Sequence, residues 1–156
     1  MPTLAADTLP VWVALTAVTA VLLAAALAVP TAPPPDAAAL ARAVDAVAAS
    51  DHPTRRTLPV RADAVRLHPA RLSLRSDGGT ATATLRYGPV VPASGRLAAV
   101  LAGRDVRDVF ETPAAFRDAV ERALARARTR AGGWLTTDRL RVRHVTWGDV
   151  DATLVG

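Results

Sequence analysis

The sequence predicts an α+β fold, in which one N-terminal transmembrane helix is followed by a small domain with two antiparallel hairpins and two or three helices. Three observations predict it. Residues 11–29 form an uncharged apolar run, two segments alternate apolar and polar residues, and helical spacing of apolar residues lies around them. The 156 residues allow one ordinary domain after the apolar run.

The composition excludes several kinds of site. The chain has no cysteine, which removes disulfides, thiolate metal ligands and cysteine nucleophiles. All 19 basic residues are arginine and stand against 14 acidic residues, so the formal net charge is +5. Because arginine stays charged at any accessible pH, the basic pI by itself is only a weak sign of nucleic-acid binding.

The first element is the run from Val11 to Val29, which follows a flank of residues 1–10 and lies between two prolines. A helix of this length spans about 28 Å, close to the hydrocarbon thickness of a bilayer. We therefore predict a single-pass transmembrane helix. A cleaved signal peptide and a buried core helix are the alternatives, although the flank lacks the basic residues typical of a signal peptide.

Small residues recur every four positions in this run. They give a candidate helix-packing face for self-association, although a segment rich in alanine also produces such spacing by composition alone. The candidate face consists of Thr16, Ala20, Ala24 and Ala28.

The positive-inside rule hardly discriminates between the two orientations of the predicted helix, because arginine is missing near both ends of the run. We expect a cell-membrane protein with an extracytoplasmic domain.

A proline-rich spacer, residues 30–36, separates the run from the domain, residues 37–156. Consecutive prolines favour an extended backbone. Asp36 stands where a helix N-cap belongs. Leu40, Val44 and Val47 then follow helical spacing, which predicts a helix that ends near Ser50.

Strand patterns fill the middle of the chain. Arg71 to Arg75 and Thr80 to Tyr87 alternate apolar and polar residues around a Ser-Asp-Gly-Gly turn, which predicts a hairpin. The earlier run Ala64 to His68 alternates likewise, and Pro69 limits it to a sheet edge or a break.

Helical spacing returns between Gly95 and Phe110, in one or two short pieces. Thr112 followed by proline predicts the start of a longer helix, which ends at Gly132-Gly133. The last segment predicts a second hairpin, with alternation from Arg139 to Trp147 and a two-residue turn at Gly148.

No catalytic, cofactor or metal site is expected. His52, His68 and His144 are too scattered for a local metal motif, so each is expected in a loop or on the surface. The consecutive residues Ser50, Asp51 and His52 have the side chains of a hydrolytic triad, but neighbours in sequence cannot generally converge on one point.

Two rows of arginine are the candidate sites for an anion or a partner. One row recurs at helical spacing, and the other alternates along the last predicted hairpin. Solvated faces are the ordinary interpretation, an anionic membrane surface or an acidic protein partner comes next, and nucleic acid is the least favoured. The rows are Arg122, Arg126 and Arg130, and Arg139, Arg141 and Arg143.

Three segments carry a resemblance: PTAPPPDAA after the apolar run, DGGTATATLRYGPVVP in the first hairpin, and VTWGDVDATLVG in the second. Together they resemble a family of small, uncharacterised haloarchaeal single-pass membrane proteins, similar to those encoded beside archaeal type IV pilus or secretion components. The resemblance implies an accessory or structural role at the cell envelope. It carries over no active-site residue.

We therefore expect a membrane-anchored, non-catalytic protein that acts by protein contacts in an envelope assembly. The alternatives are an Arg-rich, membrane-tethered domain that binds anionic lipid or nucleic acid, and a membrane-tethered enzyme whose site is assembled from scattered residues. Polar residues that converge in a pocket would favour the enzyme, and an arginine patch without acids would favour the anion-binding domain.

Overall fold

The computed structural model describes residues 13–21, 32–129 and 132–156. The chain divides into two compact units, Met1–Pro33 and Pro34–Gly156. In the first unit residues 13–21 are helical, and the Thr16 hydroxyl donates to the Val13 carbonyl oxygen at 2.9 Å. The second unit holds both sheets and the four helices described below.

The predicted transmembrane helix over residues 11–29 is wrong, and so is the classification as a single-pass membrane protein. Among the described residues, no helix combines the length and the apolar character needed to cross a membrane. The described helix covers residues 13–21, which rise by roughly 14 Å, about half of a bilayer core. Thr16 and Ala20 of the candidate packing face lie in it, whereas Ala24 and Ala28 lie outside the described residues.

The second unit is an α+β domain with two sheets. Its large sheet has the strand order β1-β6-β7-β5, and its small sheet has the order β2-β3-β4. The predicted hairpins are present as the antiparallel pairs β3–β4 and β6–β7. The elements are α2 (Ala37–Ala48), β1 (Arg55–Pro59), β2 (Ala64–His68), β3 (Arg71–Ser76), β4 (Gly79–Thr84), β5 (Val90–Pro92), α3 (Arg96–Ala102), α4 (Val106–Val109), α5 (Pro113–Thr129), β6 (Arg139–Trp147) and β7 (Val150–Val155).

Two helices begin at the caps that the sequence predicts. The Asp36 carboxylate accepts a hydrogen bond from the Ala39 N–H at 2.8 Å, and the Thr112 hydroxyl accepts one from the Ala115 N–H at 3.1 Å. Each cap binds an N–H that has no partner inside the helix. The starts of α2 and α5 are therefore fixed by local sequence.

The large sheet departs from the prediction of antiparallel hairpins alone. Strand β1 pairs with β6, far away in the sequence, and β5 pairs with β7 in parallel. Strand β7 therefore lies between β6 and β5. This arrangement joins the beginning, the middle and the end of the domain in one sheet.

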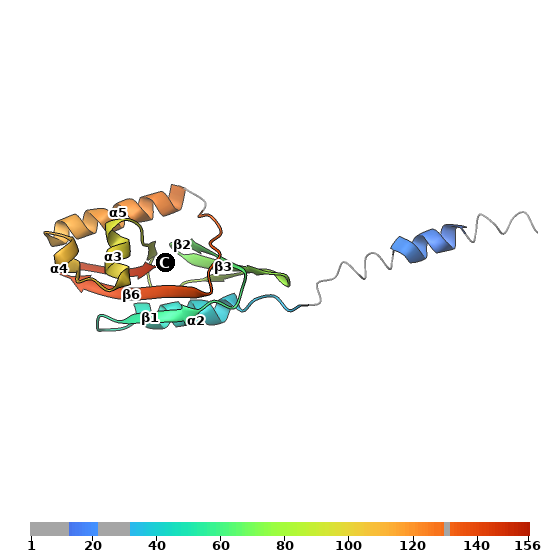
Figure 1. Cartoon of the computed structure of the whole chain (residues 1–156), viewed down its shortest axis with the longest axis horizontal. Helices are drawn as coiled ribbons and strands as arrows, with labels where there is room; N and C mark the ends of the chain where they lie inside the picture. The colour runs from blue at the N-terminus through green and yellow to red at the C-terminus, as the bar shows by residue number, and fades with distance from the viewer. Residues whose placement is uncertain (1–12, 22–31, 130–131) are drawn as a thin grey trace, which may run out of the picture. The chain divides into compact units, whose positions relative to one another are not determined.

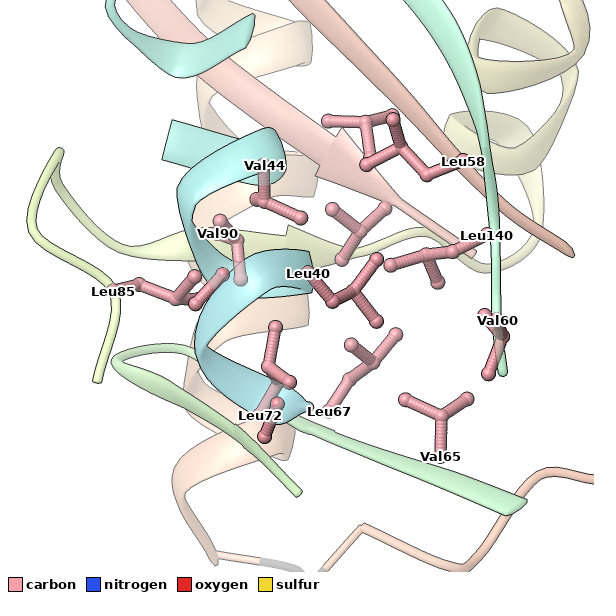
Figure 2. Close-up of a cluster of buried hydrophobic side chains, with 14 of the residues drawn as sticks. Leu40, Val44, Leu58, Val60, Val65, Leu67, Leu72, Leu85, Val90 and Leu140 are labelled. Carbon is pink, nitrogen blue, oxygen red and sulfur yellow. The ribbon is translucent and has the colours of Figure 1, made fainter. Parts of the chain in front are cut away.

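Helix α2 packs between the two sheets. Figure 2 shows Leu40 and Val44 of α2 among side chains of both sheets, including Leu67, Leu72 and Leu140. A second hydrophobic cluster joins α3, α4 and α5 to β6 and β7. Both faces of the large sheet are therefore covered, and Figure 1 shows α3 and α5 on one side and α2 on the other.

The small sheet has one covered face and one outer face. In β2 and β3, Val65, Leu67, Leu72 and Leu74 are buried toward α2. Because side chains alternate along a strand, the intervening side chains project from the opposite face. These include Arg66, His68, Arg71, Ser73 and Arg75.

Candidate anion-binding site

The register of the small sheet gathers basic and hydroxyl side chains on its outer face. Arg66 lies opposite Ser73, and His68 lies opposite Arg71. Thr82 of β4 lies opposite Ser73 on the other side. Residues directly opposite in an antiparallel pair have Cβ atoms about 5 Å apart, so these five side chains share one small area of the sheet.

These side chains line a hollow of about 330 Å³, which we call the anion pocket. Arg128 of α5 and Gly132 complete the wall. The lining holds three arginines, one histidine and two hydroxyl groups, and it contains no carboxylate. Its residues are Arg66, His68, Arg71, Ser73, Thr82, Arg128 and Gly132.

Two buried nitrogen atoms of the anion pocket have no hydrogen-bond partner: Nε of Arg66 and Nδ1 of His68. An unpaired buried polar group costs about 1–3 kcal/mol. Nε of arginine is always a donor, and Nδ1 of histidine is a donor in one tautomer and in the imidazolium form. The hydroxyls of Ser73 and Thr82 pair with each other at 2.8 Å. The anion pocket is therefore suited to a ligand that accepts hydrogen bonds.

Trp134 holds two of the arginines over the sheet. The guanidinium carbons of Arg66 and Arg75 lie 4.4 and 4.6 Å from the centroid of the Trp134 ring. Next to it, the backbone of Leu135 exchanges two hydrogen bonds with that of Val65, at 2.8 and 2.9 Å. Cation–π contacts orient guanidinium groups, so Trp134 positions Arg66 at the anion pocket.

The wall beside Trp134 depends on a glycine. A Cβ atom added to Gly132 would lie 2.8 Å from the carbonyl oxygen of Leu67, closer than real Cβ atoms approach. The chain therefore passes directly against β2 at this point. Gly133, by contrast, would place an added Cβ in open space.

The arginine rows expected from the sequence do not form this site. Arg122 and Arg126 are exposed on α5, and Arg130 lies outside the described residues. Arg139 and Arg141 are exposed on β6, and the Nε atom of Arg139 lies 3.5 Å from the carboxylate of Asp138.

The last member of the rows, Arg143, has a structural contact. It is half-buried, and its guanidinium donates to the carbonyl oxygens of Val100 and Arg104, the second at 2.8 Å. It is therefore not available to an external anion. None of the five described members of the two rows lines the anion pocket.

Sequence reasoning missed Arg66, His68, Arg71 and Arg128. For Arg66, His68 and Arg71 the signal was present, because the alternation that places leucines on the inner face of β2 and β3 places these three residues on the outer face. Arg128 lies on α5, and strand alternation gives no signal for it. The pairing of β2 with β3 was not predicted because Pro69 was interpreted as an edge or a break. In the structure Pro69 and Ala70 form the turn between the two strands.

The expectation that all three histidines lie in loops or on the surface is wrong for His144, which is 4% exposed. Its Nδ1 atom lies 3.4 Å from the Thr153 hydroxyl and 3.5 Å from a carboxylate oxygen of Asp151. The reason is register, because His144 pairs with Thr153 on the face of the large sheet that α2 covers. His52 is exposed.

A second polar hollow, of about 410 Å³, lies beside His144. Ser50, Asp51, Tyr87 and Asp151 line it. The Ser50 hydroxyl donates to the Ala46 carbonyl oxygen at 3.2 Å, so it is hydrogen-bonded to the backbone of α2. Within the described ranges, no group of three or more histidine or acidic side chains is placed to hold a metal ion.

The comparisons with known proteins give one match. A family model described as a family of unknown function (DUF7283) matches residues 3–145, which include every residue of the anion pocket. No curated protein and no solved structure matches the chain.

Proposed function

The chain belongs to the DUF7283 family of unknown function, and we propose that its domain is a non-catalytic binding module that holds an acidic segment of a protein partner in the anion pocket. One observation carries the proposal. Arg66, His68, Arg71 and Arg128 converge on a single hollow whose lining has no carboxylate. A concentration of positive charge without internal neutralisation favours an anionic ligand.

Among the described residues, no carboxylate forms an ion pair with the charges of the anion pocket. The ion pairs recorded there join Arg117 to Asp149, Arg139 to Asp138, and His144 to Asp151. Arginine presents a planar fork of N–H donors that matches the two oxygens of a carboxylate. Acidic side chains of a partner would therefore pair the cations of the anion pocket.

The layout of the charges favours a protein partner over a nucleic acid. Binding to single strands generally combines a long positive groove with free aromatic faces for stacking. Here the cations converge on one hollow of about 330 Å³. The Trp134 ring is already in contact with Arg66 and Arg75, and Arg143 is engaged with backbone.

The test is a binding measurement on the full chain by fluorescence anisotropy. The probes are labelled oligo-glutamate, oligo-glutamine of the same length, and a single-stranded oligonucleotide of the same charge. We expect oligo-glutamate to bind most tightly. Arg66→Gln and Arg71→Gln should each weaken this binding at least about tenfold, because charge-assisted hydrogen bonds are lost.

Arg139→Gln is the matched control, because Arg139 is exposed and lies outside the anion pocket. It should leave the affinity almost unchanged. Equal affinity for oligo-glutamate and oligo-glutamine would overturn the proposal. Tighter binding of the oligonucleotide would replace the protein partner by a nucleic acid.

We propose further that the partner belongs to a cell-envelope assembly, with the domain outside the cytoplasm. The sequence resemblance described above supports this location. The measurement is protease digestion of a C-terminally tagged chain in intact and in lysed cells. Digestion in intact cells is the expected result, and protection until lysis would overturn the location.

A further inference from the structure

Strand β4 is the open edge of the small sheet. The strand order is β2-β3-β4, and at the opposite edge β2 is bridged by Leu135. An edge strand carries a row of backbone groups that can pair with another strand. Building on the proposed function, we propose that the acidic partner segment binds as an additional strand along β4, with alternate side chains directed to the anion pocket.

The register identifies the backbone groups of β4 that point outward. The Leu85 N–H donates to the Ala70 carbonyl at 2.9 Å. In an antiparallel pair, hydrogen-bonded residues alternate with residues whose N–H and C=O groups point away. Counting back along the register, Ala83 and Ala81 bond to β3, whereas Thr80, Thr82 and Thr84 direct their backbone groups to the open edge.

The open run of backbone groups ends at Thr84. The next two N–H groups, of Arg86 and Tyr87, both donate to one carboxylate oxygen of Asp45, at 3.0 and 3.3 Å. Asp45 is largely buried on α2. The Asp45 carboxylate therefore occupies the N–H groups that follow β4, so an added strand can pair only along the length of β4.

Two hollows meet at this edge. The first is the anion pocket, on the outer face of the small sheet. The second is a groove of about 620 Å³ between β4 and α2, and Thr82 lines both. Because successive side chains of a strand point to opposite faces, a strand added to β4 would place one set of side chains beside Thr82, at the β4 edge of the anion pocket, and the other set in the groove.

The groove determines which side chains the second set can be. Its wall on α2 presents small side chains, among them Ala38, Ala46 and Ala49. The geometry therefore fits an extended segment in which acidic residues alternate with small apolar ones.

A second copy of this chain fits the edge less well. Strand β4 has the sequence GTATAT, without an acidic residue. Pairing of β4 with itself would satisfy the backbone groups but would bring no carboxylate to the anion pocket. Charge complementarity favours a different, acidic protein segment.

The experiment follows backbone amides of the full chain by NMR hydrogen exchange. The probe is a peptide in which glutamate and valine alternate, and its control has the same composition with the two residues in separate blocks. We expect the alternating peptide to slow exchange at Thr80, Thr82 and Thr84 at least about tenfold, because their N–H groups become bonded. Ala81 and Ala83, already bonded to β3, should change little.

A modified peptide tests the direction of the hydrogen bonds without changing the protein. N-methyl groups at alternate positions on the edge facing β4 should abolish binding, whereas N-methyl groups at the intervening positions should leave it intact. In the protein, Thr84→Pro removes one outward N–H and should weaken binding more than Thr84→Ala. The peptide result stands even if the proline variant is unstable.

The outcomes separate this inference from the proposed function. If the alternating peptide binds and Arg66→Gln weakens its binding, but the amides of Thr80, Thr82 and Thr84 stay unprotected, strand addition is overturned and the anion pocket stands. If no acidic peptide binds at all, both fail. Protection of these amides by rising protein concentration alone would show a second copy on the edge and would also overturn the inference.

Discussion

Arg55 and Arg143 lie directly opposite each other on β1 and β6, and both guanidinium groups donate to carbonyl oxygens at the end of α3. Nη1 of Arg55 binds the Ala102 oxygen at 3.0 Å, and Nη1 of Arg143 binds the oxygens of Val100 and Arg104. Like charges opposite each other destabilise a sheet. Here the carbonyl end of the helix, which carries partial negative charge, accepts both.

Removing one of these arginines should weaken the attachment of α3 to the large sheet, because its hydrogen bonds to the end of α3 are lost. Arg143→Ala should lower the free energy of unfolding by about 2 kcal/mol, because two hydrogen bonds from a charged group are lost. Urea denaturation measures the change. Arg141→Ala is the control, since Arg141 is exposed on the same strand. Equal losses for the two variants would contradict a structural role for Arg143.

Gly132 should tolerate no side chain. Gly132→Ala should cost about 1–3 kcal/mol of stability, because the new Cβ meets the Leu67 carbonyl and a backbone shift is needed. The same variant should weaken binding of oligo-glutamate, since the wall of the anion pocket moves. Gly133→Ala has room for its methyl group and should be nearly neutral by thermal unfolding. If the two glycine variants melt together, the close approach is not maintained in solution.

Asp45 should stabilise the chain just after β4. Asp45→Ala leaves the N–H groups of Arg86 and Tyr87 without their acceptor and should cost about 2 kcal/mol. Asp45→Asn keeps an oxygen acceptor and should cost less. Hydrogen exchange at the two amides checks the cause, because both should exchange faster in the alanine variant. Unchanged exchange would show that the carboxylate is not their acceptor.

Trp134 should act on binding through Arg66. Trp134→Leu removes two cation–π contacts, each about 0.5–1 kcal/mol, and should reduce the affinity for oligo-glutamate several-fold in calorimetric titration. Leu135→Ala is the control, because the bridge to Val65 uses backbone atoms. An affinity unaffected by Trp134→Leu would mean that Arg66 keeps its position without the ring.

The elements that the sequence predicted are those with local causes. Asp36 and Thr112 cap the helices that follow them directly, and each predicted hairpin joins strands through a short turn. Strands β1 and β5 were missed. Leu58 is the only buried residue of β1, so this strand shows no alternation, and β5 has three residues whose partner is β7. Such strands form by pairing with strands that are distant in the sequence, and the local order of apolar and polar residues does not show these partners.

The candidate site was missed for a similar reason. Arg66 and Arg71 belong to alternating runs, but only the pairing of β2 with β3 brings them together. Arg128, near the end of α5, and Gly132, which follows the helix, join them. The apolar run at residues 11–29 misled in the opposite way, because the helix described in it covers only residues 13–21, too short to cross a bilayer.

The pairing of β1 with β6 also has a consequence for protein synthesis. Strand β1 leaves the ribosome long before β6, its only neighbour in the large sheet, whereas β2, β3 and β4 are consecutive and pair locally. The small sheet, which carries the anion pocket, can therefore form on the nascent chain while the large sheet is still incomplete. Until β6 and β7 emerge, the apolar side of α2 lacks part of its cover, and this is when the chain is most exposed to proteases and aggregation.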